Sequence, residues 1–262
     1  MENSVRPYYV PVGNEERVFL AAFRQGLPIM LKGPTGCGKT RFVEAMAHQA
    51  GRPLITVVCH DDLSTADLVG RYLLQGGETR WVDGPLTRAV REGAICYLDE
   101  VVEARQDATV VLHPLADHRR QLPIDRLGTT LDAAEGFCLV VSYNPGYQSV
   151  LKDLKDSTRQ RMIAIELGYP PAEIEEKIIA VEAGADQREA AQLVRIGRAV
   201  RQADAPGLRE VASTRVLISA AKLIAQGLAP GEAALAAIAG PLTDDPLVAA
   251  NLAAVIDAYV QE

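Results

Sequence analysis

This chain of 262 residues has no excess of positive charge and no long hydrophobic run. Its 27 basic and 34 acidic residues give a net charge of −7, which argues against a protein that binds nucleic acid through overall positive charge. No uninterrupted apolar run approaches the length needed to span a bilayer, and residues 1–13 lack the apolar core of a signal peptide. We therefore expect a cytoplasmic protein that inserts into no membrane and binds no nucleic acid.

Aromatic residues are sparse at 5%, and cysteine and histidine occur only four times each. The cysteines, Cys37, Cys59, Cys96 and Cys138, form no CxxC pair, and the histidines show no HxxxH or HExxH spacing, so we expect no protein-bound zinc site. The last three cysteines lie inside apolar runs, which predicts buried, reduced thiols.

Five short apolar runs alternate with helix-length segments over the first two thirds of the chain. Such alternation is typical of a parallel sheet with helices on both faces. The runs are IMLKG (29–33), LITVVCH (54–60), AICYLDE (94–100), FCLVVSYNP (137–145) and MIAIEL (162–167).

The strand signal ends at the sequence YPP (169–171), because a Pro-Pro pair continues neither a strand nor a helix. Helical patterns follow at 170–184, 188–203, 213–227 and 245–260, divided by glycine and proline. The sequence therefore predicts an α/β domain over residues 1–169 and a smaller all-helical domain over residues 170–262.

The sequence GPTGCGKT, Gly33 to Thr40, matches the phosphate-binding pattern G-x-x-x-x-G-K-[ST] between an expected strand and an expected helix. Its glycines let consecutive backbone N–H groups converge on phosphates at a helix N-terminus. Lys39 is expected to reach the β- and γ-phosphates of ATP, and the Thr40 hydroxyl to bind Mg²⁺. We expect the nucleotide to be bound by Gly33, Pro34, Thr35, Gly36, Cys37, Gly38, Lys39, Thr40 and Arg41.

The sequence ICYLDE places two acids at the end of a buried strand. Asp99 is expected to hold Mg²⁺ through water, and Glu100 to polarise the water that attacks ATP. A third strand ends at Asn144, which could hold the same water or sense the γ-phosphate, although Asn-Pro-Gly also makes a good turn by itself.

Together these motifs resemble an AAA+ ATPase. Residues 67–100 are similar to the helix-2 insert region of the MoxR branch of that superfamily, and residues 118–145 to its pre-sensor-1 hairpin. The runs LKGPTGCGKTRFVE, ICYLDEVVEARQD, SYNPGYQ and LKDLKDSTRQR resemble the CbbQ/NirQ/NorQ subgroup. The resemblance covers nearly the whole chain and implies a three-layer P-loop domain followed by a helical lid domain.

The resemblance also implies a homo-hexameric ring whose nucleotides lie between neighbouring subunits. An arginine supplied in trans would then complete each site; Arg161 matches the family's finger best, and Arg159 could assist or substitute. Arg215, at a helix start, matches the sensor-2 arginine, while an ion pair with a nearby acid is the alternative. Residues 8–12 (YYVPV) occupy a position that contacts adenine in relatives, although core packing explains them equally well.

Members of the subgroup work with an adaptor that carries a von Willebrand factor A domain. Some remodel inhibited Rubisco and release sugar phosphates, and others promote maturation of nitric oxide reductase. We expect the Rubisco role first, with the reductase as the alternative, and association with carboxysomes is left open. A small-molecule kinase and a nucleotide-dependent scaffold with little turnover are the alternatives from other classes.

Two hairpins are expected to face a client or partner. Gly76-Gly77 separates two strand-like runs at 71–81, and Trp81 is expected to pack this hairpin rather than to contact a ligand. The sequence HRRQLPID (118–125) is expected to place Arg119 and Arg120 on the second hairpin, either as a solvated basic tip or as a partner surface.

Overall fold

The computed structural model describes residues 6–145, 156–203 and 211–260. The chain divides into two compact units. The α/β unit comprises Met1–Gly33 with Lys39–Leu167, and the helical unit comprises Pro34–Gly38 with Gly168–Glu262. Residues 146–148 and 151–155, which belong to two of the motifs quoted for the family resemblance, lie outside the described residues.

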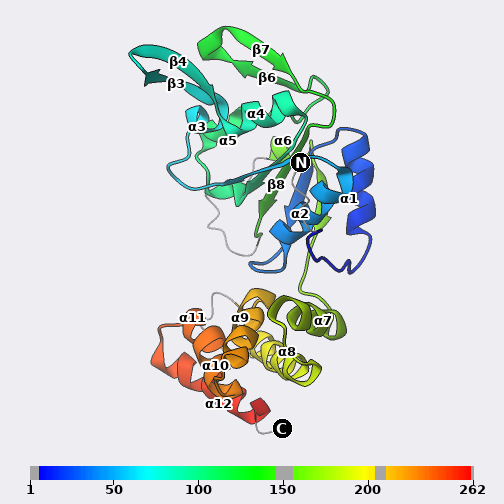
Figure 1. Ribbon diagram of the computed structural model, residues 1–262, viewed down its shortest axis with the longest axis vertical. Helices are drawn as coiled ribbons and strands as arrows, with labels where there is room; N and C mark the ends of the chain where they lie inside the picture. The colour runs from blue at the N-terminus through cyan, green and yellow to red at the C-terminus, as the bar shows by residue number, and fades with distance from the viewer. Residues whose placement is uncertain (1–5, 146–155, 204–210, 261–262) are drawn as a thin grey trace. The chain divides into compact units, whose positions relative to one another are not determined.

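A parallel five-stranded sheet forms the centre of the α/β unit (Figure 1). All five predicted strands are present, in the order β2-β5-β8-β1-β9. Their bounds are Ile29–Lys32 (β1), Leu54–Val58 (β2), Ile95–Asp99 (β5), Cys138–Tyr143 (β8) and Ile163–Glu166 (β9). The three central strands are almost wholly buried, which is why each appears in the sequence as a continuous apolar run.

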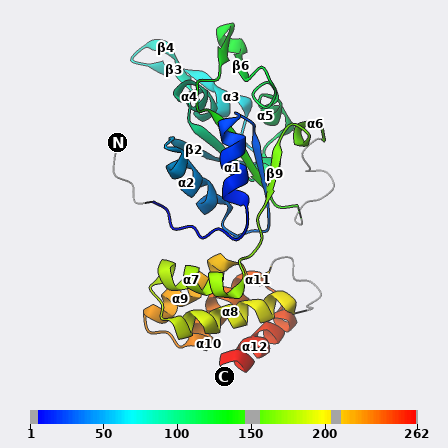
Figure 2. The same cartoon turned by 90° about the vertical axis from the view of Figure 1, so that its right-hand side faces the viewer.

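Helices cover both faces of this sheet, so the predicted three-layer arrangement is confirmed (Figures 1 and 2). Helices α1 (Glu15–Arg24) and α2 (Lys39–Ala50) pack together through an edge-to-face contact of Phe19 with Phe42. On the other face, α4 contacts β2 and β5, and α3 contacts α4 and α5. The bounds on that face are Thr65–Val69 (α3), Pro85–Glu92 (α4) and Gln106–Val110 (α5).

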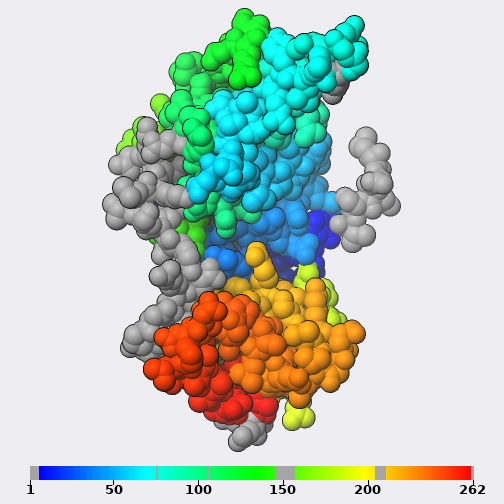
Figure 3. Space-filling model, turned by 90° about the vertical axis from the view of Figure 1, so that its left-hand side faces the viewer, coloured from blue at the N-terminus to red at the C-terminus, as the bar shows by residue number. Residues whose placement is uncertain are grey.

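Two antiparallel hairpins lie at the same end of the α/β unit, as Figure 3 shows in cyan and green. The first pairs β3 (Gly70–Gln75) with β4 (Glu78–Asp83), and the turn glycines Gly76 and Gly77 both have positive φ, as predicted for a two-residue turn. Trp81 packs edge-to-face against Tyr72 across this hairpin, so its predicted packing role is confirmed.

The prediction for the second hairpin was wrong in one respect. This hairpin pairs β6 (Gln121–Ile124) with β7 (Thr129–Asp132), so Arg119 and Arg120 precede it and form no basic tip. The Arg120 guanidinium donates to the carbonyl oxygens of Gly26 and Phe137, which ties the base of the hairpin to the body of the unit. Arg119 is exposed and bonds to Asp117, whose pKa it lowers to about 2.

The helical unit contains the four predicted helices and one stretch that was not predicted. The four are α7 (Ala172–Ala183), α8 (Gln187–Gln202), α9 (Thr214–Ala225) and α12 (Pro246–Val260). Between the last two lie α10 (Pro230–Ala234), a π-helical turn (Leu235–Ala239) and α11 (Gly240–Leu242). No helix in the described parts of the chain is both long enough and apolar enough to cross a membrane.

Candidate nucleotide-binding site

The phosphate-binding motif forms the connection from β1 to α2. Gly36 and Gly38 adopt φ values of +68° and +100°, which side chains with a Cβ atom rarely adopt. The Gly33 N–H donates to the Tyr143 carbonyl at 3.3 Å, so the start of the loop is attached to the end of β8. The first turn of α2 contains no acid, and its positive N-terminal dipole is therefore left available to an anion.

Lys39 is the first residue of α2, and its ammonium group donates to the Gly33 carbonyl oxygen at 2.7 Å. The side chain is thus folded back along the loop that the motif assigns to phosphates. A phosphate oxygen carries negative charge and is a stronger acceptor than a carbonyl, so it would compete well for this donor.

Thr40 and Asp99, the two residues assigned to Mg²⁺ from the sequence, lie close together. Thr40 is the second residue of α2, Asp99 is the last residue of β5, and the Thr40 hydroxyl lies 3.4 Å from Asp99 Oδ2. Hydroxyl and carboxylate oxygens are hard donors, and Mg²⁺ is typically held by one or two such protein ligands together with substrate phosphates and water. The donor set therefore fits Mg²⁺ presented with a nucleotide.

The other oxygen of Asp99 is held by two residues that sequence reasoning missed. Tyr97 Oη donates to Asp99 Oδ1 at 2.7 Å, and Ser142 Oγ donates to the same oxygen at 2.5 Å. Burial, and next the negative charge of Asp99, raise the pKa of Tyr97, so the phenol keeps its proton. The sequence does contain one signal for Tyr97. Side chains two residues apart in a strand lie on the same face, which puts Tyr97 and Asp99 on one face of β5.

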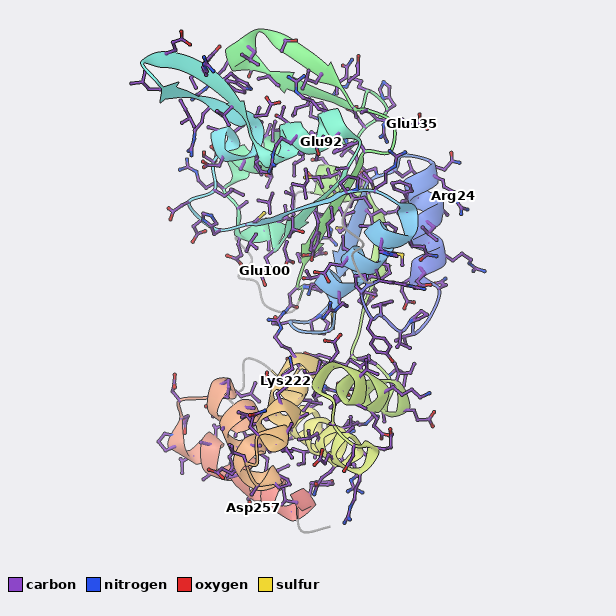
Figure 4. All side chains as sticks on the ribbon, viewed as in Figure 1. Arg24, Glu92, Glu100, Glu135, Lys222 and Asp257 are labelled. Atoms are coloured by element: carbon purple, nitrogen blue, oxygen red, sulfur yellow. The ribbon has the colours of Figure 1, made fainter. Side chains whose placement is uncertain are left out.

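Glu100 follows β5 and has a left-handed backbone, with φ 55° and ψ 46°. Such a conformation is uncommon for a residue other than glycine and is found often at functional sites. The Glu100 N–H donates to Ser142 Oγ at 3.1 Å, and the side chain is exposed. Figure 4 labels Glu100 toward the opposite end of the α/β unit from the two hairpins.

The remaining predicted site residues lie on three other segments. Asn144 directly follows β8 and is half-buried. Arg159 ends the short helix α6 (Asp156–Arg159) and is half-buried, and Arg161 is exposed just before β9. Arg215 is exposed in the first turn of α9, in the helical unit. Within the α/β unit, the structure thus brings Lys39, Thr40, Asp99 and Glu100 to the carboxyl ends of neighbouring strands, beside Asn144.

Three of the four cysteines lie outside this polar cluster. Cys59, Cys96 and Cys138 are buried and form no disulfide, as predicted, and burial is the main cause that raises the pKa of each to about 12. The negative charges of Asp99 and Glu100 add to the effect at Cys59. These thiols therefore stay protonated at neutral pH.

Two family models match the chain. Residues 28–162 match the AAA domain of the dynein-related subfamily, and residues 175–259 match the CbbQ/NirQ/NorQ C-terminal domain. Together they cover most of both structural units.

Similar proteins include members of all three named types. The denitrification regulatory protein NirQ of Stutzerimonas stutzeri is 59% identical, covering 95% of this chain and 91% of its own. The NorQ protein of Paracoccus denitrificans is also 59% identical, with 94% and 91% covered, and the CbbQ protein of Hydrogenophilus thermoluteolus is 56% identical, with 92% and 90% covered.

Solved structures resemble the fold at low sequence identity. A mutant of RuvB from Thermotoga maritima aligns with a TM-score of 0.59 at 15% identity, covering 95% of this chain and 71% of that one. NtrX from Brucella abortus aligns with a TM-score of 0.54 at 18% identity, covering 86% and 53%.

Proposed function

This chain belongs to the CbbQ/NirQ/NorQ group of AAA ATPases, and from that premise we propose that it hydrolyses ATP with Mg²⁺ to remodel a client enzyme. The observation that carries the proposal is the meeting of the Thr40 hydroxyl with the Asp99 carboxylate at 3.4 Å, next to Lys39 and Glu100. The phosphate-binding loop and the two acids come from separate parts of the sequence, and the fold brings them together. This arrangement suits the binding of a nucleoside triphosphate with its metal ion.

Each residue has a role in this proposal. The loop of residues 33–41 binds the phosphates, chiefly through the backbone N–H groups that follow Pro34, and Lys39 neutralises their charge. Thr40 and Asp99 hold Mg²⁺, which when bound offsets negative charge on the phosphate oxygens. Glu100 accepts a proton from the attacking water, and Asn144 orients that water or contacts the γ-phosphate.

We further propose that the site is completed by a neighbouring subunit in a hexameric ring. Arg161, assisted or replaced by Arg159, is the candidate finger, and Arg215 is the candidate residue through which the helical unit responds to nucleotide. Family membership supports these assignments, as do the exposure of Arg161 and Arg215 and the absence of acids from the first turn of α9.

Membership of the group also supports a proposal for the adaptor and the client. We propose that this protein is cytoplasmic, that its partner carries a von Willebrand factor A domain, and that its client is either Rubisco or nitric oxide reductase. Relatives named for denitrification and the CbbQ relative match this chain at nearly equal identity, 59% and 56%, so identity adds no support to the preference for Rubisco.

The first experiment tests hydrolysis. We expect Glu100→Gln to bind ATP as wild type does but to lower the hydrolysis rate by about 10² to 10⁴-fold, because the proton acceptor is lost. Lys39→Ala, in contrast, should lose both nucleotide binding and hydrolysis. Phosphate release and equilibrium binding of a fluorescent ATP analogue measure the two effects. A scaffold would keep its partner function in Glu100→Gln, and a kinase would phosphorylate a metabolite; either result contradicts the motor.

The second experiment identifies the client. The protein and a co-purified adaptor are added with ATP to Rubisco inhibited by a sugar phosphate, and in parallel to inactive nitric oxide reductase. If one of the two enzymes is activated by the wild-type protein but not by Glu100→Gln, that enzyme is the client. If neither enzyme is activated, both assignments are contradicted.

A further inference from the structure

The carboxylate of Asp99 is asymmetrically bonded. Its Oδ1 atom accepts from Tyr97 at 2.7 Å and from Ser142 at 2.5 Å, whereas its Oδ2 atom has a longer 3.4 Å contact with Thr40. A good O–H···O hydrogen bond is about 2.5 to 3.0 Å long, so Oδ1 is well occupied and Oδ2 keeps capacity for another ligand. Tyr97 and Ser142 are both 0% exposed, so water does not readily replace either donor.

We propose that Tyr97 and Ser142 are positioning residues that aim Asp99 Oδ2 toward Thr40 and so prepare the Mg²⁺ site. The proposal rests on the ATPase function proposed above. A carboxylate with no fixed donors turns readily about its terminal bond. Two donors on one oxygen remove that freedom before the metal arrives, in the way that outer partners orient other metal ligands.

Ser142 has a second contact that Tyr97 lacks. Its Oγ atom accepts the Glu100 N–H at 3.1 Å while its own proton is donated to Asp99. One buried hydroxyl therefore fixes both the metal-holding acid and the backbone of the water-activating acid, whose φ of 55° requires support. Tyr97 Oη contacts Ser142 Oγ at 3.1 Å but makes no hydrogen bond to the Glu100 N–H. Removal of Tyr97 Oη should therefore disturb mainly metal binding, whereas removal of Ser142 Oγ should also disturb the position of Glu100.

The test compares Tyr97→Phe, Ser142→Ala and Ser142→Thr with wild type. Thr87→Val is the matched control, because the Thr87 hydroxyl is also buried and donates to the Val69 carbonyl at 2.6 Å, on the other face of the sheet. Binding of fluorescent ADP is measured in EDTA and then across a Mg²⁺ titration. Hydrolysis is measured at saturating Mg²⁺, and thermal unfolding reports stability.

We expect binding in EDTA to be unchanged in all variants. The Mg²⁺ concentration that gives half of the full increase in ADP binding should rise about tenfold or more in Tyr97→Phe and Ser142→Ala. It should not rise in Ser142→Thr or Thr87→Val. At saturating Mg²⁺, Tyr97→Phe should recover most of its turnover and Ser142→Ala should not.

If Tyr97→Phe and Ser142→Ala show the same Mg²⁺ dependence as wild type, the proposal is overturned, whatever their melting temperatures. The two hydroxyls would then contribute only to the stability of the sheet. That failure is distinct from failure of the ATPase proposal. In the latter case wild type itself would show no Mg²⁺-dependent nucleotide binding.

Discussion

At the scale of single residues, Glu15 organises a segment that has no regular structure. Its carboxylate accepts the Val12 and Gly13 N–H groups, both at 2.7 Å, and the Tyr9 hydroxyl at 2.9 Å. Burial alone would raise the pKa of Glu15, but these hydrogen bonds stabilise the charged form and hold the pKa below its usual value. The segment that precedes α1 thus depends on one ionised side chain.

This predicts an acid-sensitive contribution to stability. Because the folded pKa is lowered, the contribution is present above the unfolded pKa of about 4.3 and is lost as pH falls through the folded pKa. Glu15→Gln should lower the free energy of unfolding by about 1 to 3 kcal/mol at pH 7 and by less in acid. Urea unfolding at pH 7 and pH 3 measures this, with Glu135→Gln, a change at an exposed position, as the control. Equal losses at both pH values would contradict the prediction.

Residue positions were predictable where residue type and spacing both indicate them. Lys39, Thr40, Asp99 and Glu100 lie at the ends of buried strands or at the helix start, where the phosphate loop and the strand-end acid pair predict them, while their roles stay predictions. Tyr97, in contrast, looks in the sequence like one more apolar strand residue. Its role depends on a hydrogen bond to Asp99 that is shared with Ser142, and Ser142 comes from a separate strand that only the fold brings beside β5.

At the scale of elements, apolar patterning predicted the sheet and four long helices, because buried strands and amphipathic helices differ in period. It did not predict residues 230–242, whose small apolar residues are interrupted by glycine and proline and show no polar face. Packing against the other helices of the unit decides that segment. Arg120 was misplaced for a similar reason, since its acceptors, Gly26 and Phe137, lie far from it in the sequence.

A buried ion pair joins three helices of the helical unit. Glu175 of α7 is 0% exposed and accepts two hydrogen bonds from Arg201 of α8, at 2.6 and 2.8 Å. It also accepts from the Thr214 hydroxyl at the start of α9 at 2.6 Å, and Arg201 lies 4.2 Å from the ring centre of Tyr169. The segment that carries Arg215 is therefore anchored by this pair.

Glu175→Gln should lower the free energy of unfolding by about 3 to 5 kcal/mol, because the Arg201 charge remains buried without its partner. The double variant Glu175→Gln with Arg201→Met should cost less than the sum of the single changes, because it removes the stranded charge. Chemical denaturation of the full chain measures the cycle. Additive losses would show that the two groups stabilise the unit independently.

The β3–β4 hairpin exposes apolar side chains to solvent, where they add nothing to the stability of a single folded chain. Leu74 is 76% exposed, and Tyr72 and Val82 of the same hairpin are 46% and 39% exposed. If this hairpin contacts the client or adaptor, Leu74→Ser should change the free energy of unfolding by no more than about 0.5 kcal/mol yet sharply reduce client activation. Val58→Thr on β2, where Val58 is 62% exposed, is the control. Equal activation by both variants would remove the hairpin from the partner surface.

At the scale of the whole molecule, the proposed ring makes each active site a joint product of two chains. Glu100 of one subunit would act with Arg161 or Arg159 of the next. A ring made only of Glu100→Gln subunits, or only of subunits that lack both arginines, should therefore be inactive. Loss of the trans arginines should lower turnover by about 10³-fold or more while nucleotide binding remains, because the charge acts mainly in the transition state.

Mixing the two inactive variants separates a trans site from a cis one. In a random ring of Glu100→Gln and Arg159→Ala/Arg161→Ala subunits, roughly a quarter of the seams join an intact Glu100 to intact neighbouring arginines. ATP hydrolysis should therefore reappear on mixing, after dissociation and reassembly, at a substantial fraction of the wild-type rate. If the arginines acted within their own subunit, no mixture would contain a complete site, and the mixed sample would stay as inactive as its components. Mixing Glu100→Gln with Lys39→Ala is the control, because both changes damage the same side of the seam.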